Sequence, residues 1–192
     1  MRATLLLLAG GASRRMGRPK ALLDVGGETL IEFVRRRLRT GFDDVLVSTN
    51  EPDALPPELR ATCVRDRLPG AGPLAGIEAG LAAARNDVVF AVACDMPYVD
   101  LSLARKLVSA SRGFDAAVPR IDGRPEPVCA AYRRRSLPAI TRALDGGVRK
   151  AAEALQRLDV CWCDGLDLDA LRSINTPDDW AGFVATRSRG GP

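Results

Sequence analysis

Short apolar runs alternate along the chain with longer segments in which apolar residues recur at helical spacing. The apolar runs predict strands at residues 4–8, 44–49, 61–65, 88–93, 116–119 and 128–132. The amphipathic segments predict helices at residues 30–39, 73–84, 101–111 and 137–144. This alternation predicts an α/β fold in which helices cover both faces of a mostly parallel central sheet.

The pattern continues to the end of the chain with an amphipathic segment at 148–158, the short apolar run "VCWC" and a helix opened by "NTPDDW". In that opening, Thr176 is expected to cap the helix and Pro177 to occupy its first turn. No repeat or low-complexity segment divides the chain, so one domain is expected over residues 1–186. Residues 187–192 are expected to form a disordered tail.

Composition narrows the possible partners. The chain has 192 residues, which suffices for one substantial core. Its net charge of +4 is scattered along the sequence and aromatic residues make up only 5%, so a small anionic ligand is favoured over nucleic acid. No apolar run approaches the ~20 residues that span a bilayer, and the N-terminus lacks a signal-peptide cleavage pattern. A cytoplasmic protein without a membrane partner is therefore expected.

The histidine and cysteine content excludes some chemistry. Histidine is absent, so a Ser-His-Asp triad is excluded and a structural zinc site is disfavoured. The five cysteines are odd in number and lie mostly inside apolar runs, which predicts reduced thiols rather than a disulfide framework.

The stretch "LLLLAGGASRRMGRPK", residues 5–20, places glycines and cations directly after a predicted central strand. In open α/β sheets, ligands bind at the carboxyl ends of strands. Gly10 and Gly11 allow successive backbone N–H groups to face phosphate oxygens. The cations that follow suit a triphosphate: Arg14, Arg15, Arg18 and Lys20. The glycine spacing fits neither the P-loop nor the dinucleotide fingerprint, and a solvated basic turn is the alternative interpretation.

A carboxylate follows a second predicted central strand, in "VVFAVACDMPYVD", residues 88–100. Asp95 lies where this strand ends, beside the expected phosphate loop, and a carboxylate there suits Mg²⁺ bound jointly with substrate phosphates. The alternative is that Asp95 caps the helix beginning near residue 101. Asp100 and Ser102 are better placed for capping, so the metal role is favoured.

A third motif, "GAGPLAGIEAGLAAA", residues 70–84, combines glycines with a small-residue helix face. Pro73 suits a first helical turn. The small face would let the helix lie close to either the sheet or a ligand, and the sequence does not separate these two interpretations.

These motifs resemble those of a known family. "LAGGASRRMGRPK" at 8–20, "GPLAGI" at 72–77, "CDMP" at 94–97 and "NTPDD" at 175–179 are similar to the molybdenum cofactor guanylyltransferases of the nucleotidyltransferase superfamily. The resemblance covers nearly the whole chain and implies a single-domain Rossmann-like nucleotidyltransferase fold. It also implies GTP and molybdopterin as substrates, transfer of GMP to the terminal phosphate of molybdopterin, release of pyrophosphate and use of Mg²⁺. Transient contact with other molybdenum-cofactor or molybdoenzyme proteins is a further expectation.

The resemblance, together with the positions of residues in the sequence, assigns roles to individual residues. The expected nucleotide-binding residues are Leu8, Ala9, Gly10, Gly11, Lys20, Asn50, Asp66 and Asp95, with Asp95 also binding the metal. The expected catalytic residues are Arg15, Lys20 and Asp95, and the expected acceptor-binding residues are Asn175 and Arg124. Two positions depart from the family pattern. Ser48 stands where relatives carry a nucleotide-contacting asparagine, which leaves Asn50 for that role, and Ser173 stands where some relatives carry the first asparagine of the pterin side.

The implied chemistry agrees with the residue content. A phosphate monoester with a second pKa near 6 is largely dianionic at neutral pH and needs no protein base, which suits a chain without histidine. Arg124 could alternatively be a solvated residue flanking a strand. Two other functions compete: a related nucleotidyltransferase that uses CTP or another nucleotide on a different cofactor precursor or sugar phosphate, and a non-catalytic GTP-binding module.

Overall fold

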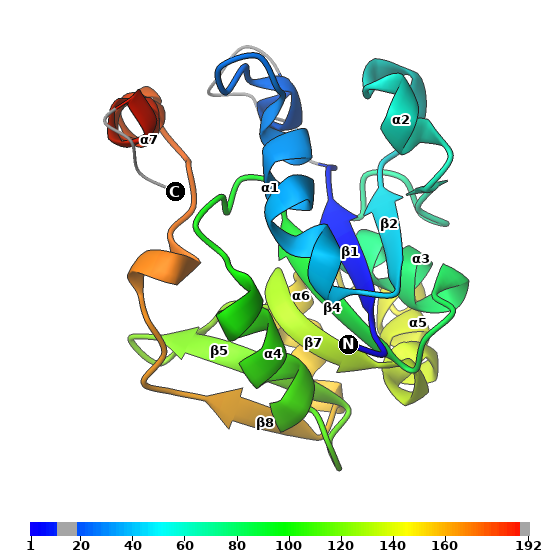
Figure 1. Cartoon of the computed structure of the whole chain (residues 1–192). Coiled ribbons are helices and arrows are strands. Elements are labelled where there is room, and N and C mark those ends of the chain that lie inside the picture. Colours follow the sequence, from blue (N-terminus) through cyan, green and yellow to red (C-terminus); the bar gives the residue numbers. More distant parts are fainter. Residues whose placement is uncertain (11–18, 189–192) are drawn as a thin grey trace.

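A computed structural model describes residues 1–10 and 19–188 of the chain. In that part of the chain a central sheet contains strands β1 (Thr4–Leu8), β2 (Asp44–Ser48), β3 (Cys63–Val64), β4 (Val88–Ala93), β5 (Ala116–Ile121), β6 (Arg124–Pro125), β7 (Cys129–Arg133) and β8 (Val160–Cys163). Seven α-helices accompany it in the same ranges: α1 (Leu30–Leu38), α2 (Pro57–Arg60), α3 (Pro73–Ala83), α4 (Leu101–Ala110), α5 (Leu137–Asp145), α6 (Ala151–Ala154) and α7 (Pro177–Ser188). Figure 1 shows their arrangement.

The strand order is β3-β2-β1-β4-β7-β5-β6, with β8 pairing the other side of β5. Strands β1, β2, β3 and β4 are parallel to one another, whereas β7 is antiparallel to both β4 and β5. The parallel half brings the carboxyl ends of β1 and β4 together, because Leu8 pairs with Ala93. This edge of the sheet is where ligands bind in open α/β folds.

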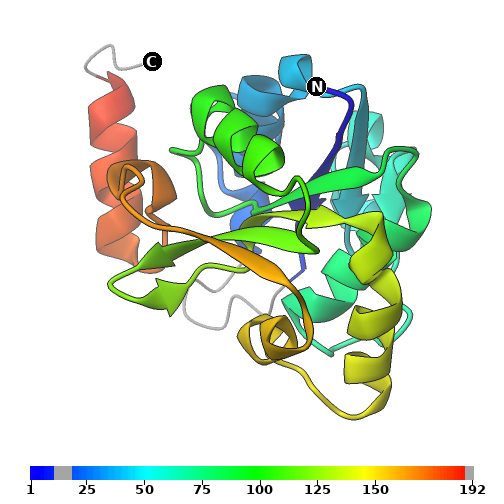
Figure 2. The same cartoon turned by 90° about the horizontal axis from the view of Figure 1, so that it is seen from below.

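The alternating side chains of β1 fill two layers. Leu5 and Leu7 belong to the apolar cluster that includes residues of α1 and α4, whereas Leu6 and Leu8 belong to the cluster that includes residues of α3 and α5. Successive strand residues point to opposite faces of the sheet, so two of the four buried leucines pack into each apolar layer. In Figure 2, α1 and α4 lie on one side of the sheet and α5 and α6 on the other. The predicted fold class, with helices on both faces, is confirmed.

The predicted elements differ from the observed ones mainly at their ends and in two short strands. The strand expected at 61–65 is shortened to Cys63–Val64, and β6 was not predicted. The segment expected at 148–158 divides into α6 and a 3₁₀ turn at Leu155–Arg157. The expected tail from residue 187 is wrong at its start, because α7 extends to Ser188 and the Arg187 guanidinium donates to the Val25 carbonyl at 3.1 Å. Residues 189–192 lie outside the described residues.

The small-residue face of α3 packs against the sheet. A Cβ atom added at Gly80 would lie 2.3 Å from a methyl group of Leu6, and one added at Gly76 would lie 2.5 Å from the Ser48 hydroxyl. The helix begins after Gly72, whose φ of 76° favours glycine. Close packing therefore explains the two helical glycines, while the first turn of α3 faces the carboxyl edge described below.

Other expectations concern the cysteines and membrane segments. All five cysteines are free, and Cys94 and Cys129 are buried, as expected of reduced core thiols. Across residues 1–10 and 19–188, none of the helices combines the length and apolar character that crossing a bilayer requires.

Replacing Asp100 by alanine is expected to lower the free energy of unfolding by about 1 kcal/mol, the usual cost of losing an N-cap. The Asp100 carboxylate accepts a hydrogen bond from the Leu103 amide at 2.8 Å and thereby caps α4. Urea denaturation of the wild type and the Asp100→Ala variant measures the difference. An unchanged midpoint would show that the cap contributes nothing to stability.

Candidate active site

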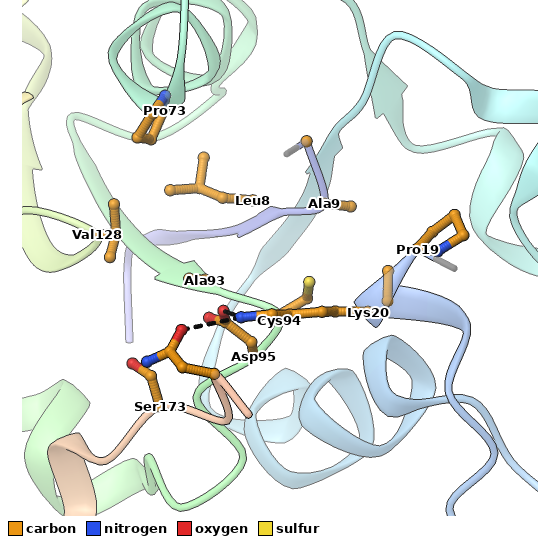
Figure 3. Close-up of a pocket in the computed structure, with 13 residues that line it drawn as sticks. Leu8, Ala9, Pro19, Lys20, Pro73, Ala93, Cys94, Asp95, Val128 and Ser173 are labelled. Atoms are coloured by element: carbon orange, nitrogen blue, oxygen red, sulfur yellow. Dashed lines mark hydrogen bonds and ion pairs between the residues drawn. The ribbon is translucent and has the colours of Figure 1, made fainter. Parts of the chain in front are cut away.

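A pocket of about 320 Å³ lies at the carboxyl edge of β1 and β4 (Figure 3). The residues that line it come from the ends of both strands, from the 3₁₀ turn at Lys20–Leu22 and the residue before it, from the first turn of α3, from the residue before β7 and from the segment before α7: Leu8, Ala9, Gly10, Pro19, Lys20, Ala21, Pro73, Ala93, Cys94, Asp95, Val128, Ser173 and Asn175. The parallel pairing of β1 with β4 explains why two motifs far apart in the sequence share this pocket.

Lys20 connects three of these segments. Its Nζ donates to Asp95 Oδ2 at 2.7 Å and to Asn175 Oδ1 at 2.9 Å (Figure 3). The Lys20 and Asp95 side chains are 16% and 22% exposed, so the ion pair is accessible from the pocket but partly shielded from solvent. The Asp95 carboxylate therefore has a cationic partner at the edge of the pocket.

A backbone hydrogen bond holds the segment that contains Asn175 at the pocket. The Ile174 amide donates to the Asp95 carbonyl at 2.8 Å, which ties the segment before α7 to the end of β4. Asp179 Oδ2 accepts from the amides of Asn175 and Thr176 at 2.9 and 2.8 Å, and the Asp179 amide donates to the Thr176 hydroxyl at 3.1 Å. These bonds, that from Asn175 first, lower the pKa of Asp179. The predicted cap at Thr176 is confirmed.

A second polar group lies beside the pocket, at the ends of β2 and β3. Asp66 accepts from the Ser48 hydroxyl at 3.1 Å and from Asn50 Nδ2 at 3.0 Å, while its own amide donates to Asn50 Oδ1 at 3.1 Å. The Ala9 amide donates to the Ser48 carbonyl at 2.9 Å, so this group is joined to the wall of the pocket. Ser48 and Asn50 thus share one partner, which the sequence did not indicate.

The thiol in the pocket wall is not suited to nucleophilic chemistry. Cys94 is buried, and its burial, with a smaller effect of the Asp95 charge, raises its pKa to about 12. The thiolate is the nucleophilic form, so a protonated Cys94 is an apolar wall residue at neutral pH.

The sequence did not indicate that Glu126 lies close enough to the pocket to interact with Asp95. In the β4–β7 ladder Val92 pairs with Cys129, and the Ala93 amide donates to the Val128 carbonyl at 2.9 Å, so the chain before β7 runs back beside the chain after β4. Burial raises the pKa of Glu126, and the charge of Asp95 raises it further. No local signal could have revealed this proximity, because it depends on the direction of β7.

The remaining predicted residues are distributed as follows. Six lie in the pocket lining: Leu8, Ala9, Gly10, Lys20, Asp95 and Asn175. Asn50 and Asp66 form the adjacent polar group. Arg124 lies exposed on β6 and is not part of the pocket lining, so its acceptor-binding role stays a prediction. Gly11 and Arg15 lie outside the described residues.

The donor set at the pocket fits a metal ion shared with a substrate. Residues 1–10 and 19–188 contain no group of three or more His, Cys, Asp or Glu side chains placed to bind a metal by themselves. Among the described residues that line the pocket, Asp95 is the one carboxylate, and it pairs with the Lys20 ammonium group. Mg²⁺ commonly takes one or two carboxylates and completes its coordination with phosphate oxygens and water.

Known proteins resemble this chain over nearly its full length. The family model described as MobA-like NTP transferase domain matches residues 5–159. A probable molybdenum cofactor guanylyltransferase from Pelotomaculum thermopropionicum is 38% identical over 201 residues, covering 100% of this chain and 97% of that protein. A molybdenum cofactor guanylyltransferase from Pseudomonas putida is 39% identical over 184 residues, covering 91% of this chain and 94% of that protein. The crystal structure of molybdopterin-guanine dinucleotide biosynthesis protein A from Archaeoglobus fulgidus has a TM-score of 0.84 at 28% identity, covering 97% of this chain and 99% of that one.

Proposed function

The chain belongs to the family of MobA-like NTP transferases, and from this premise we propose that it transfers GMP from GTP to the terminal phosphate of molybdopterin, releasing pyrophosphate. The family makes it a nucleotidyltransferase. The observation that carries the proposal is the contact of Lys20 with both Asp95 and Asn175, because it joins the expected nucleotide side of the pocket to the expected acceptor side.

The nucleotide is proposed to bind along the carboxyl edge of β1 and β2. The backbone at Leu8, Ala9 and Gly10 lines the pocket and is available to the nucleotide, and Lys20 contacts the phosphates. Asp66, oriented by Asn50, lies at the neighbouring strand end. Gly11 and Arg15 keep their proposed roles in phosphate binding and charge neutralisation.

Asp95 is proposed to bind Mg²⁺ together with phosphate oxygens of the nucleotide. When bound, the ion neutralises charge at the α-phosphate and the departing pyrophosphate. Lys20 Nζ contacts Asp95 Oδ2 at 2.7 Å, so an ion held by this carboxylate would place its positive charge next to the ammonium group. The phosphates then provide new anionic partners for the ammonium group.

The protein's own task is positioning and charge neutralisation. An acceptor phosphate that is already dianionic attacks without a general base, consistent with a chain that contains no histidine. Asn175 is proposed to contact the acceptor, with Ser173 beside it in the pocket lining. Arg124 is proposed as a further acceptor contact. A cytoplasmic location and contact with other molybdenum-cofactor proteins stay predictions.

A pyrophosphate-release assay tests the proposal. With Mg²⁺ and molybdopterin present, GTP is expected to support release at a rate at least ~10-fold above ATP, UTP or CTP, a difference that corresponds to about 1.4 kcal/mol. Omission of molybdopterin is expected to abolish release.

Other results of the assay would contradict the proposal. Equal or faster release with CTP would indicate a related nucleotidyltransferase of different base specificity. GTP binding in a direct titration without release under any condition would indicate a non-catalytic GTP-binding module.

A further inference from the structure

A buried carboxylate lies on α3, outside the pocket. Glu78 is only 4% exposed, although it carries a charge in a helix otherwise composed of apolar and small residues. A charge in such a position is costly unless it is paired and hydrogen-bonded. Its partner is Arg67, whose Nη2 donates to Glu78 Oε1 at 2.9 Å and whose Nε donates to Oε1 and Oε2 at 3.1 and 3.3 Å.

Arg67 joins three elements. Its Nη2 also donates to Asp145 Oδ1, the last residue of α5, at 2.8 Å. Helices α3 and α5 lie side by side on one face of the sheet (Figure 1). Arg67 therefore attaches the chain that follows β3 to both helices. Unlike Glu78, it keeps about half of its side chain in solvent, with 47% exposed.

Arg67 directly follows Asp66 in the sequence, and the two side chains bond to different elements. Asp66 bonds to Ser48 and Asn50 at the end of β2, whereas Arg67 bonds to α3 and α5. The short β3 ends at Val64 and, among the described strands, pairs with β2 alone, so regular strand pairing does not fix residues 65–67. The two sets of side-chain bonds fix this segment instead.

A buried ion pair is weak evidence for a role in stability, since apolar residues of similar volume commonly stabilise as well or better. The bidentate contact between Arg67 and Glu78 does, however, fix the orientation of one side chain relative to the other. We propose that Glu78 is a positioning residue for nucleotide binding: by orienting Arg67 against α3, it fixes the backbone of Asp66 and aims the Asp66 carboxylate at the nucleotide. This inference rests on the proposed function for its nucleotide, but the effect of Glu78 on Asp66 is measurable in the free protein.

The first experiment follows amide hydrogen exchange of Asp66 by NMR in the free protein. The Asp66 amide donates to Asn50 Oδ1, so its protection reports the position of this segment. Glu78→Gln keeps the size of the side chain and removes its charge. It is expected to speed exchange at the Asp66 amide by about threefold or more. This factor is near the lower limit of the effects usually seen when a residue acts on a site through its neighbours.

The control is Glu28→Gln. Glu28 precedes α1 and forms an ion pair of similar length, 2.8 Å, with Arg36 of that helix. The control variant is expected to leave exchange at Asp66 unchanged. If Glu78→Gln does not fold, the double variant Glu78→Met/Arg67→Met replaces it, because exchanging both partners of the ion pair for apolar residues leaves no unpaired buried charge, and the same faster exchange is expected. Unchanged exchange at Asp66 in a folded Glu78 or Arg67 variant would overturn the proposal.

The second experiment is a titration with GTP. Glu78→Gln is expected to raise the Kd by roughly 3- to 30-fold in the wild-type background and to have no further effect in an Asp66→Asn background. An equal factor in both backgrounds would overturn the proposal, because the effect would then bypass Asp66. Failure of the wild type to bind GTP would instead contradict the proposed function, while the exchange result would still decide the role of Glu78.

Discussion

Replacing Asp95 by asparagine is expected to lower the rate of nucleotidyl transfer by ~10²-fold or more, because losing a preorganised electrostatic element costs about 3 kcal/mol of transition-state stabilisation. Asparagine keeps the size and shape of the side chain, removes the charge and exchanges one acceptor oxygen for an NH₂ donor. The Asp95 carboxylate faces the pocket and bonds to Lys20, whereas α4 is capped by Asp100. Loss of charge is therefore expected to affect metal binding and not the helix.

Steady-state kinetics over a range of Mg²⁺ concentrations measure this effect. Higher Mg²⁺ is expected to recover part of the rate if weakened metal occupancy is the cause, and GTP affinity without metal is expected to change little. Asp100→Ala is the matched comparison, since it should lower stability and leave the Mg²⁺ dependence unchanged. Normal turnover with normal Mg²⁺ dependence but earlier unfolding in Asp95→Asn would instead assign Asp95 a structural role.

Replacing Lys20 by alanine is expected to weaken GTP binding and to lower turnover, together by on the order of 10²-fold in kcat/KM, a loss of about 2.7 kcal/mol. The ammonium group is the positive charge that the described residues place in the pocket lining, and it bonds to both Asp95 and Asn175. Its removal deprives the phosphates of a compact point charge. Lys20→Arg is expected to rescue only part of the loss, because the planar fork has a different geometry.

Stability of the free protein separates a binding role from a structural one. Water reaches the partly exposed Asp95 carboxylate, so removal of Lys20 is expected to change the free energy of unfolding by less than about 1 kcal/mol. Lys150→Ala, which removes a lysine that is 81% exposed, controls for the change in net charge. A large loss of thermal stability in Lys20→Ala alone would show that Lys20 is chiefly a structural residue.

The local pattern of the sequence predicted most of the elements, and six of the residues named from the pattern and the family resemblance line the pocket. β1 and β4 have the predicted bounds, and α3 and α4 end within one residue of them. Apolar periodicity and helix caps are set by neighbouring residues, so they are visible without the fold. Placing Lys20 and Asp95 together required one further inference, that both follow parallel central strands. Their 2.7 Å contact agrees with it.

The direction of β7 and the partners of the C-terminal segment were decided only by tertiary structure. β7 was predicted as one more strand of a mostly parallel sheet, yet it pairs antiparallel with β4 and thereby brings Glu126 near Asp95. A strand has the same alternation in either direction, so its orientation is not visible in the sequence.

The same limit applies to the contacts that complete the site. Asn175 reaches Lys20 because the Ile174 amide bonds to the Asp95 carbonyl, and Arg67, in the segment after β3, bonds to Glu78 on α3. The sequence by itself determined which residues could bind phosphate and metal, because side-chain chemistry and local periodicity are properties of neighbouring residues. Which of them meet depends on pairing between distant segments, and that pairing is selected by the burial of both faces of the sheet as a whole.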